Sequence, residues 1–133
     1  MKLTTKSEYS VLALIHIARN QTRGYVRIED ICAAYGMPKK YLEQLLIMLK
    51  QNGLVRTRRG VGGGYVLAVP PGEITLARVI RLMDWALAPV ESVSTHFFSH
   101  TPLEQERKVT RLFKDIRDYI AQRMEHTTLA DVI

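Results

Sequence analysis

Three arginines followed by a run of glycines carry the clearest chemistry in this chain. Arg56, Arg58 and Arg59 stand in one short stretch, directly ahead of Gly60, Gly62, Gly63 and Gly64. Guanidinium groups this close repel one another unless an anion lies opposite. The glycines remove side-chain bulk and let the backbone approach a partner closely. The pattern therefore predicts a surface that binds a polyanion.

Two apolar runs flank this basic tip. Leu54–Val55 precedes it and Tyr65–Val69 follows it, and strand, glycine-containing turn, strand is typical of a β-hairpin. We expect the three arginines at the tip of the hairpin. One of them is expected to point away from the partner, because side chains alternate along a strand. A basic, glycine-rich hairpin directly after a helix indicates the wing of a winged helix-turn-helix placed against DNA.

The residues before the hairpin predict the helix-turn-helix itself. Helices are expected over residues 28–35 and 38–52, with Gly36 as a C-cap and Pro38 in the first turn of the second helix. The second helix is the expected reader of DNA, because its first turn is polar and exposed.

This first turn holds the candidate base contacts. They are Lys39, Lys40, Tyr41, Glu43 and Gln44. Lysine binds phosphate or guanine, glutamine can bond to adenine, and glutamate accepts a hydrogen bond from cytosine. Two alternatives stay open: Tyr41 packs against the turn, and Glu43 pairs with Lys39 or Lys40.

Positive charge is concentrated in the same part of the chain. The 133 residues carry a net charge of +6 and a pI of about 9.7, which indicates a polyanionic partner. Residues 1–60 hold eleven basic and four acidic side chains, a net of +7, whereas residues 61–133 hold eight and nine, a net of −1. The first part is therefore expected to bind DNA and the second part to do something else.

Three further helices are expected around this module. The first covers residues 4–19, with Lys6 placed to contact DNA phosphates beside the helix N-terminus. Residues 74–87 form an amphipathic helix, and residues 88–102 are irregular. The last helix, 103–125, has a single apolar stripe that needs a partner. That stripe, the expected dimer interface, is formed by Val109, Leu112, Phe113, Ile116, Tyr119 and Ile120.

Composition excludes several classes of protein. The single cysteine, Cys32, excludes an intramolecular disulfide and a cysteine metal cluster. We expect it to be a small buried hydrophobe, with a redox switch as the alternative. The apolar run 11–18 is short and broken by His16, so neither a signal peptide nor a membrane span is expected and the protein is expected in the cytoplasm without a membrane partner. No Walker loop or catalytic triad spacing is present, which argues against an enzyme.

The stretch YLEQLLIMLKQNGLVRTRRGVGGGYVLA, with the opening KLTTKSEYSVLALIHIA, resembles the Rrf-type family of bacterial winged-helix regulators. The first helix, the helix-turn-helix, the R-G-x-G-G-G-Y wing and the I-T-x-x-x-V-I-R helix all fall in register. The resemblance implies a homodimer whose long helices cross and whose two reading helices bind a partly palindromic operator. It also implies that the wings enter the minor groove with Arg59, and that the acid at Glu43 tunes which sites are bound.

The resemblance departs at the loop where many members hold an iron–sulfur cluster through three cysteines, since Ala88–Thr101 holds none. We therefore expect a cluster-free member without a cofactor, which responds to a small molecule or a partner protein or acts without a known signal. No metal is expected, and the alternative is a site formed by Glu91, His96 and His100. A further hypothesis is an effector pocket lined by Trp85, Phe97 and Phe98.

Together these features predict a mainly α fold with a small β-hairpin wing. Residues 1–72 are expected to form a winged helix-turn-helix DNA-binding domain, and residues 73–133 a linker helix, the sensing loop and a long C-terminal dimerisation helix. The predicted function is a sequence-specific regulator of transcription, a repressor as most members of this family are, that binds double-stranded DNA as a homodimer. The alternatives are a metal- or small-molecule-sensing regulator that uses residues 88–102, and a winged-helix module that binds a protein.

Overall fold

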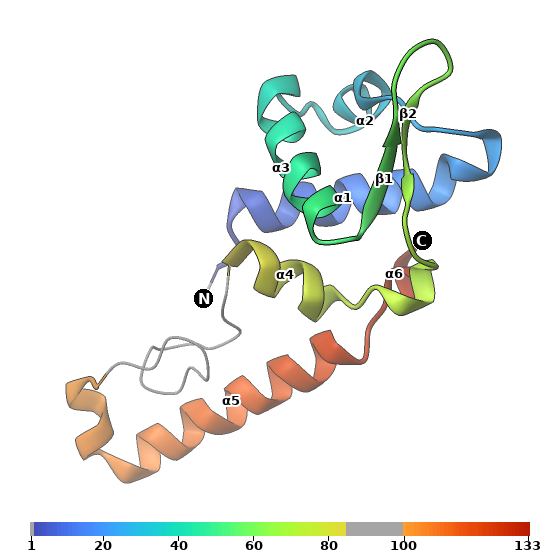
Figure 1. Ribbon diagram of the computed structural model, residues 1–133. Coiled ribbons are helices and arrows are strands. Elements are labelled where there is room, and N and C mark those ends of the chain that lie inside the picture. Colours follow the sequence, from blue (N-terminus) through green and yellow to red (C-terminus); the bar gives the residue numbers. More distant parts are fainter. Residues whose placement is uncertain (1, 85–99) are drawn as a thin grey trace.

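The structure is a computed structural model that describes residues 2–84 and 100–133. Helix α1 (Thr5–Asn20) runs through the middle of its upper part in Figure 1. The Thr4 side chain accepts a hydrogen bond from the Ser7 backbone amide at 3.3 Å and so caps the helix. Leu14 and Ile17 are fully buried. Because α1 contacts α2, α3, α4 and α6, it is the element around which the core forms.

Helices α2 (Ile28–Tyr35) and α3 (Lys39–Gln51) form the helix-turn-helix. The bounds of α2 match the prediction, and Gly36 ends it in the left-handed conformation at φ 67°. The placement of Pro38 in the first turn of α3 was wrong, because Pro38 has an extended backbone and precedes the helix as its N-cap residue. The inner face of α3 is apolar and buried, and it consists of Leu42, Leu45, Leu46 and Leu49.

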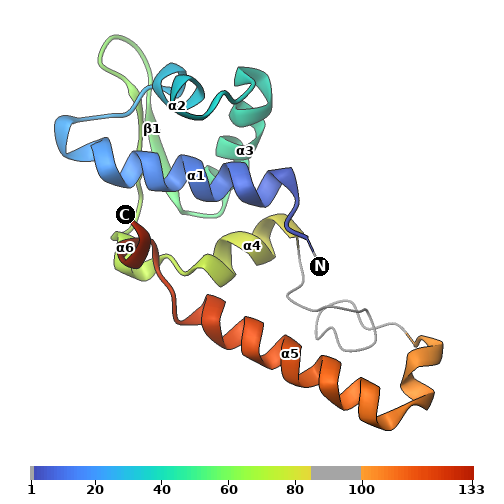
Figure 2. The same cartoon turned by 180° about the vertical axis from the view of Figure 1, so that it is seen from behind.

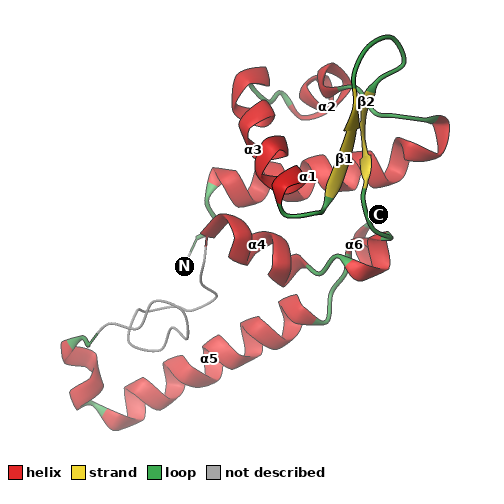
Figure 3. Ribbon diagram, viewed as in Figure 1, coloured by secondary structure: helices red, strands yellow, loops and turns green. Residues whose placement is uncertain are grey.

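The hairpin consists of β1 (Val55–Arg58) and β2 (Gly64–Leu67), the two strands of the antiparallel sheet in Figure 3. Val55 pairs with Leu67 and Arg58 pairs with Gly64. Strand pairing thus continues further than the apolar residues indicate, so the placement of Arg56 and Arg58 at the tip was wrong and only Arg59 lies there. Val26 forms an isolated β-bridge on the other side of β2, because it exchanges two backbone hydrogen bonds of 2.8 Å with Tyr65.

Helix α4 (Leu76–Asp84) closes the core from below and is joined to the start of α1 through its last residue. The Asp84 carboxylate accepts hydrogen bonds from the Thr4 hydroxyl and from the buried Ser7 hydroxyl, the latter at 2.7 Å. The helix starts two residues later than the expected 74, because the Thr75 side chain accepts from the Arg78 amide at 3.1 Å and caps it. The expected end at residue 87 lies outside the described residues.

The long helix α5 (Arg107–Glu125) packs against α4 near its C-terminal end, and its start points away from the other helices, as both views show (Figures 1 and 2). It is shorter than the expected 103–125, because Pro102–Gln105 form a separate turn of 3₁₀ helix and Glu106 has an extended backbone. None of its residues is buried. Ile120 and Met124 are partly buried against α4, but most other apolar residues of the helix are exposed, which is unusual for a helix of 19 residues in a folded protein.

After α5 the chain returns to the core through a helix that was not predicted, α6 (Leu129–Val132). Thr128 and Asp131 form a reciprocal capping box, and Leu129 is fully buried beside α1. A β-bridge between Thr75 and Thr128 joins the end of α5 to the start of α4. One core therefore contains residues from both ends of the chain.

Candidate nucleic-acid interface

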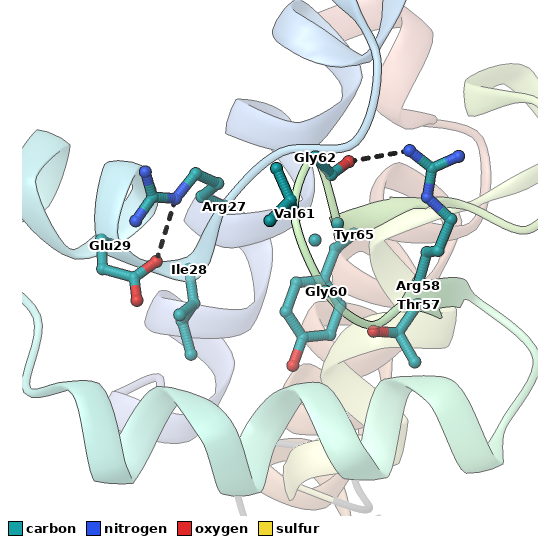
Figure 4. A pocket seen from close by; sticks show the side chains of 11 residues that line it. Arg27, Ile28, Glu29, Thr57, Arg58, Gly60, Val61, Gly62 and Tyr65 are labelled. Carbon is teal, nitrogen blue, oxygen red and sulfur yellow. Dashed lines mark hydrogen bonds and ion pairs between the residues drawn. The ribbon is translucent and has the colours of Figure 1, made fainter.

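A cavity of about 670 Å³ lies between the hairpin with its turn and the start of α2 (Figure 4). In this view α3 lies below the cavity, the hairpin forms its right side, and the start of α2 with Arg27 and Glu29 forms its left side. The polar side chains of α3 point outward because the leucines of the same helix face the core. The fold thus places the hairpin turn beside Arg27 and Glu29, and the ion pair between Glu29 and Lys39 connects the start of α3 to the same region.

The expected base contacts of α3 are placed in two ways. Lys39, Lys40, Glu43 and Gln44 are exposed, as is Ile47, which is 53% exposed one turn further along. The ring of Tyr41 is half-buried and meets the ring of Tyr9 edge to face, with centroids 5.7 Å apart. Tyr41 thus packs inside the protein, but against α1 and not against the turn as the alternative supposed.

An ion-pair chain at the start of α2 constrains one of the lysines. The Lys39 ammonium lies 3.2 Å from the Glu29 carboxylate, which lies 3.6 Å from the Arg27 guanidinium. A hydrogen bond from its own backbone and then the bond from Lys39 lower the pKa of Glu29. Glu43, expected as an alternative partner of Lys39 or Lys40, has no ion pair within residues 2–84 and 100–133. Sequence reasoning missed Arg27 and Glu29, because ten residues separate Glu29 from Lys39 and only the turn between α2 and α3 brings them together.

The three hairpin arginines have different surroundings. The Arg58 guanidinium donates a hydrogen bond to the Gly62 carbonyl at 3.0 Å and lies over the Tyr25 ring, 4.7 Å from its centroid. Arg56 and Arg59 are exposed, and in the described part of the chain neither side chain has a hydrogen bond or an ion pair. Gly62 has a positive φ of 74° in the turn. Two cations are therefore open to a partner and the third is held by the hairpin itself.

The remaining candidate DNA contact, Lys6, is exposed in the first turn of α1. The Asp84 carboxylate of the same chain lies at this helix start, where it accepts hydrogen bonds from the Thr4 amide and from the hydroxyls of Thr4 and Ser7. Whether Lys6 contacts a phosphate beside this helix start stays a prediction.

The apolar stripe of α5 divides along the helix. Val109, Leu112, Ile116 and Tyr119 are 39%, 55%, 37% and 65% exposed, and Phe113 is half-buried. Ile120, also expected at the dimer interface, instead packs against Ala77 and Ile80 of α4. The exposed part of the stripe thus extends from Val109 to Tyr119, and the helix packs against α4 from Ile120 onward.

Most residues expected to form the sensing loop and the effector pocket lie outside the part of the chain that the structure describes. Trp85, Glu91, His96, Phe97 and Phe98 lie outside the described residues. His100 is described, and its Nδ1 atom lies 2.7 Å from the Glu104 carboxylate. Within the described ranges no three His, Cys, Asp or Glu side chains gather as a metal site, and no helix there has the length and apolarity to cross a membrane.

The single cysteine does not fit an iron–sulfur cluster. Cys32 is half-buried on α2, and the three-cysteine ligand set that the resemblance implies cannot be formed from a sequence with one cysteine. Burial raises the pKa of the Cys32 thiol, followed by the effect of the Glu29 carboxylate. A raised pKa leaves less reactive thiolate, which disfavours the redox-switch alternative.

The comparisons with known proteins agree with this geometry. A family described as Rrf2, iron-dependent transcriptional regulator, matches residues 3–133. The regulator CymR of Bacillus subtilis is 34% identical over 133 residues, which cover 99% of this chain and 89% of CymR. IscR of Cronobacter sakazakii is 43% identical over 84 residues, which cover 63% of this chain and 52% of IscR.

The solved structures extend the match to the fold. The structure of B. subtilis CymR, titled the global cysteine regulator of that organism, superposes with a TM-score of 0.80 at 32% identity and covers 99% of this chain and 95% of CymR. IscR of T. potens superposes with a TM-score of 0.77 at 28% identity, over 99% of this chain and 85% of its own. The mainly α fold with a two-stranded wing is thus confirmed, and the chain belongs to the Rrf2 family of winged-helix transcriptional regulators.

Proposed function

We propose that this protein is a repressor that binds a partly palindromic DNA operator as a homodimer. The observation that carries the proposal is the exposed basic surface of the helix-turn-helix and its hairpin, with Lys39 and Lys40 at the start of α3 and two arginines, Arg56 and Arg59, that have no partner within the described residues. Cations left without a partner at a folded surface are available to DNA phosphates, whose neutralisation releases counterions. The net charge of +7 within residues 1–60 supports the same conclusion.

The start of α3 is proposed to enter the major groove. Lys40 and Gln44 project from its exposed face, with Glu43 between them. Gln44 can bond to adenine, Lys40 to guanine or phosphate, and Glu43 can accept from the cytosine amino group. Lys39 contributes less, because Glu29 already neutralises it. Tyr41 acts through its packing on Tyr9 rather than by touching a base.

The hairpin is proposed to reach the adjacent minor groove. Arg59 stands at the tip, and a narrow minor groove attracts a guanidinium through its negative potential. Arg56, exposed on β1, and Lys6, exposed on α1, contact the phosphates on either side. The absence of a side chain at Gly62 lets the tip backbone approach the sugar–phosphate chain.

The exposed stripe of α5 is proposed to pair two copies of the chain. Val109, Leu112, Ile116 and Tyr119 leave apolar surface in water that a second α5 would cover, with Phe113 at the edge of the contact. Two copies place two α3 helices on successive half-sites about one DNA turn apart. Residues 1–72 thus read DNA and residues 73–133 set the spacing between the two heads.

A small molecule or a partner protein is proposed as the effector, since the single cysteine does not support a cluster. A ligand that binds with different affinity to two arrangements of the heads would shift operator affinity by that difference. The second candidate function, a winged-helix module that binds an acidic protein, uses the same basic surface without DNA.

The test is affinity selection of genomic DNA fragments by the purified protein, followed by sequencing. We expect a recurring two-fold-symmetric site and a steep fall in affinity with salt. Weak binding without a common motif, together with retention of an acidic protein, would replace the repressor with the protein-binding module.

A further inference from the structure

The Arg58 side chain folds back onto its own hairpin, whereas its neighbours Arg56 and Arg59 are exposed and have no partner within the described residues. Its guanidinium donates to the Gly62 carbonyl across the turn, at 3.0 Å, as Figure 4 shows. Its other side lies over the ring of Tyr25, with 4.7 Å between the guanidinium carbon and the ring centroid. A planar cation on an aromatic face is a stabilising contact, and arginine forms it more often than lysine does.

The two partners come from different parts of the chain. Tyr25 precedes α2 and is followed by Val26, whose backbone is bonded to Tyr65 of β2. Gly62 belongs to the turn, which closes through a hydrogen bond of 3.0 Å from the Gly63 amide to the Gly60 carbonyl. Arg58 therefore links the turn of the hairpin to the body of the helix-turn-helix.

The link from Arg58 adds to the other contacts of the turn, which include the Gly63–Gly60 hydrogen bond and the close packing of Gly64 on Val26. An isolated two-stranded hairpin is marginally stable in water, and Val61 at the tip is fully exposed. Gly60, Gly62 and Gly64 all have positive φ angles, so the backbone there has wide freedom when it is not held. The turn also packs closely on Arg58, since a Cβ on Gly63 would lie 2.2 Å from the Arg58 carbonyl oxygen.

We propose that Arg58 and Tyr25 position the wing for DNA, and that Arg58 does so without binding a phosphate. The pair holds residues 59–63 in the conformation that presents Arg59 to the minor groove. The inference rests on the proposed function, and it assigns to Tyr25, an uncharged residue outside the hairpin, an effect on DNA affinity.

The experiment uses variants of the full chain on the selected operator, with affinity measured over a range of salt concentrations. Tyr25→Leu removes the ring face and Tyr25→Phe keeps it. We expect Tyr25→Leu to weaken binding about 5-fold, with the slope of log affinity against log salt unchanged, and Tyr25→Phe to bind as the unmodified protein does.

A double-mutant cycle of Tyr25→Leu with Arg58→Gln isolates the coupling. The two changes should be clearly less than additive if they break the same link. Arg56→Gln, two residues earlier on the same strand, is the matched control: it loses the same charge, and its effect should add to that of Tyr25→Leu. Additive losses in the first pair, or Tyr25→Leu binding as tightly as the unmodified protein, would overturn the inference.

A measurement without DNA separates this inference from the proposed function. NMR order parameters of the amides of residues 59–63 should fall in Tyr25→Leu and stay unchanged in Tyr25→Phe. If no operator is found, the proposed function fails while this result can still hold. Unchanged order parameters in a folded Tyr25→Leu variant would overturn the link itself.

Discussion

The winged helix-turn-helix of residues 1–72, called the head below, and helix α5 bury their apolar residues to very different extents. In the head, the leucines of α3 are buried within one chain and leave a polar, basic exterior. In α5 no residue is buried, and Leu112 and Tyr119 are more than half exposed. The core around α1 is thus complete within one chain, whereas most of the apolar stripe of α5 stays exposed in it. The difference indicates that sequence changes in the two regions will alter different properties.

The strongest test of this contrast is the same substitution in both regions. Leu46→Ala, in the fully buried face of α3, should lower the free energy of unfolding by about 3 kcal/mol through the cavity it leaves. Leu112→Ala should cost little at low protein concentration and more at high concentration, because the dimer contributes by mass action. Urea unfolding at two concentrations measures both. If Leu112→Ala lowered the free energy of unfolding by the same amount at both protein concentrations, α5 would need no partner.

The next effect concerns assembly. Leu112→Asp places a charge in the proposed α5 contact and should give monomers that bind the operator roughly 100-fold more weakly, because the two half-sites lose their linkage. Light scattering and a gel-shift titration measure the two effects. Gln122→Asp adds the same charge at an exposed position away from the stripe and should remain dimeric. A dimeric Leu112→Asp variant would place the interface elsewhere.

A third change addresses the head alone. Arg59→Ala should weaken operator binding by about 1–3 kcal/mol and reduce the salt slope by about one, with stability unchanged, because the side chain has no partner within the described structure. Arg111→Ala on α5 removes the same charge from an exposed position and should change affinity less than about twofold. Equal effects of the two variants would mean that net charge, rather than the wing, determines binding.

The smallest expected effect is a gain. Glu29→Gln frees Lys39 and removes a negative charge beside the reading helix, so operator affinity should rise about 2- to 3-fold at low salt. The lowered pKa of Glu29 keeps it ionised at neutral pH. Its contribution to stability is therefore present above its ordinary pKa of 4.5 and is lost as the pH falls through the lowered pKa. Glu73→Gln, exposed and remote on the chain, is the control, and a gain of equal size there would remove the specific role of Glu29.

The sequence was sufficient to predict the elements with a long periodic pattern or a strong cap. The spacing of apolar residues predicted α1, α2 and α3 to within one or two residues, and Gly36 marked the end of α2. It did not predict α6, because four residues are too few to show a helical period. The only local signal was the capping-box pair, Thr128 and Asp131. The break at Glu106 was also missed, because residues 104–108, EQERK, are all good helix formers and give no stop signal.

The contacts within the candidate site were harder to predict than its location. The basic charge and the glycines indicated the surface, but its internal links join residues far apart in the chain. Glu29 meets Lys39 through the turn between two helices, and Tyr25 meets Arg58 through the sheet edge at Val26. Neither Tyr25 nor Glu29 stands out in the sequence, because their roles depend on tertiary geometry alone. The effector pocket expected at Trp85, Phe97 and Phe98 lies outside the described residues and stays a prediction.

The joint at the end of α5 has a mechanical consequence. The Thr75–Thr128 bridge and the Arg81–Glu125 ion pair of 2.6 Å fix that end of the helix to α4. The 19 residues of α5 extend about 28 Å from there, so a rotation of about 5° at the joint displaces the far end by about 2.4 Å. In a dimer paired through α5 the helix is thus a lever arm, and the stiffness of this small hinge sets how far apart the two reading heads can move.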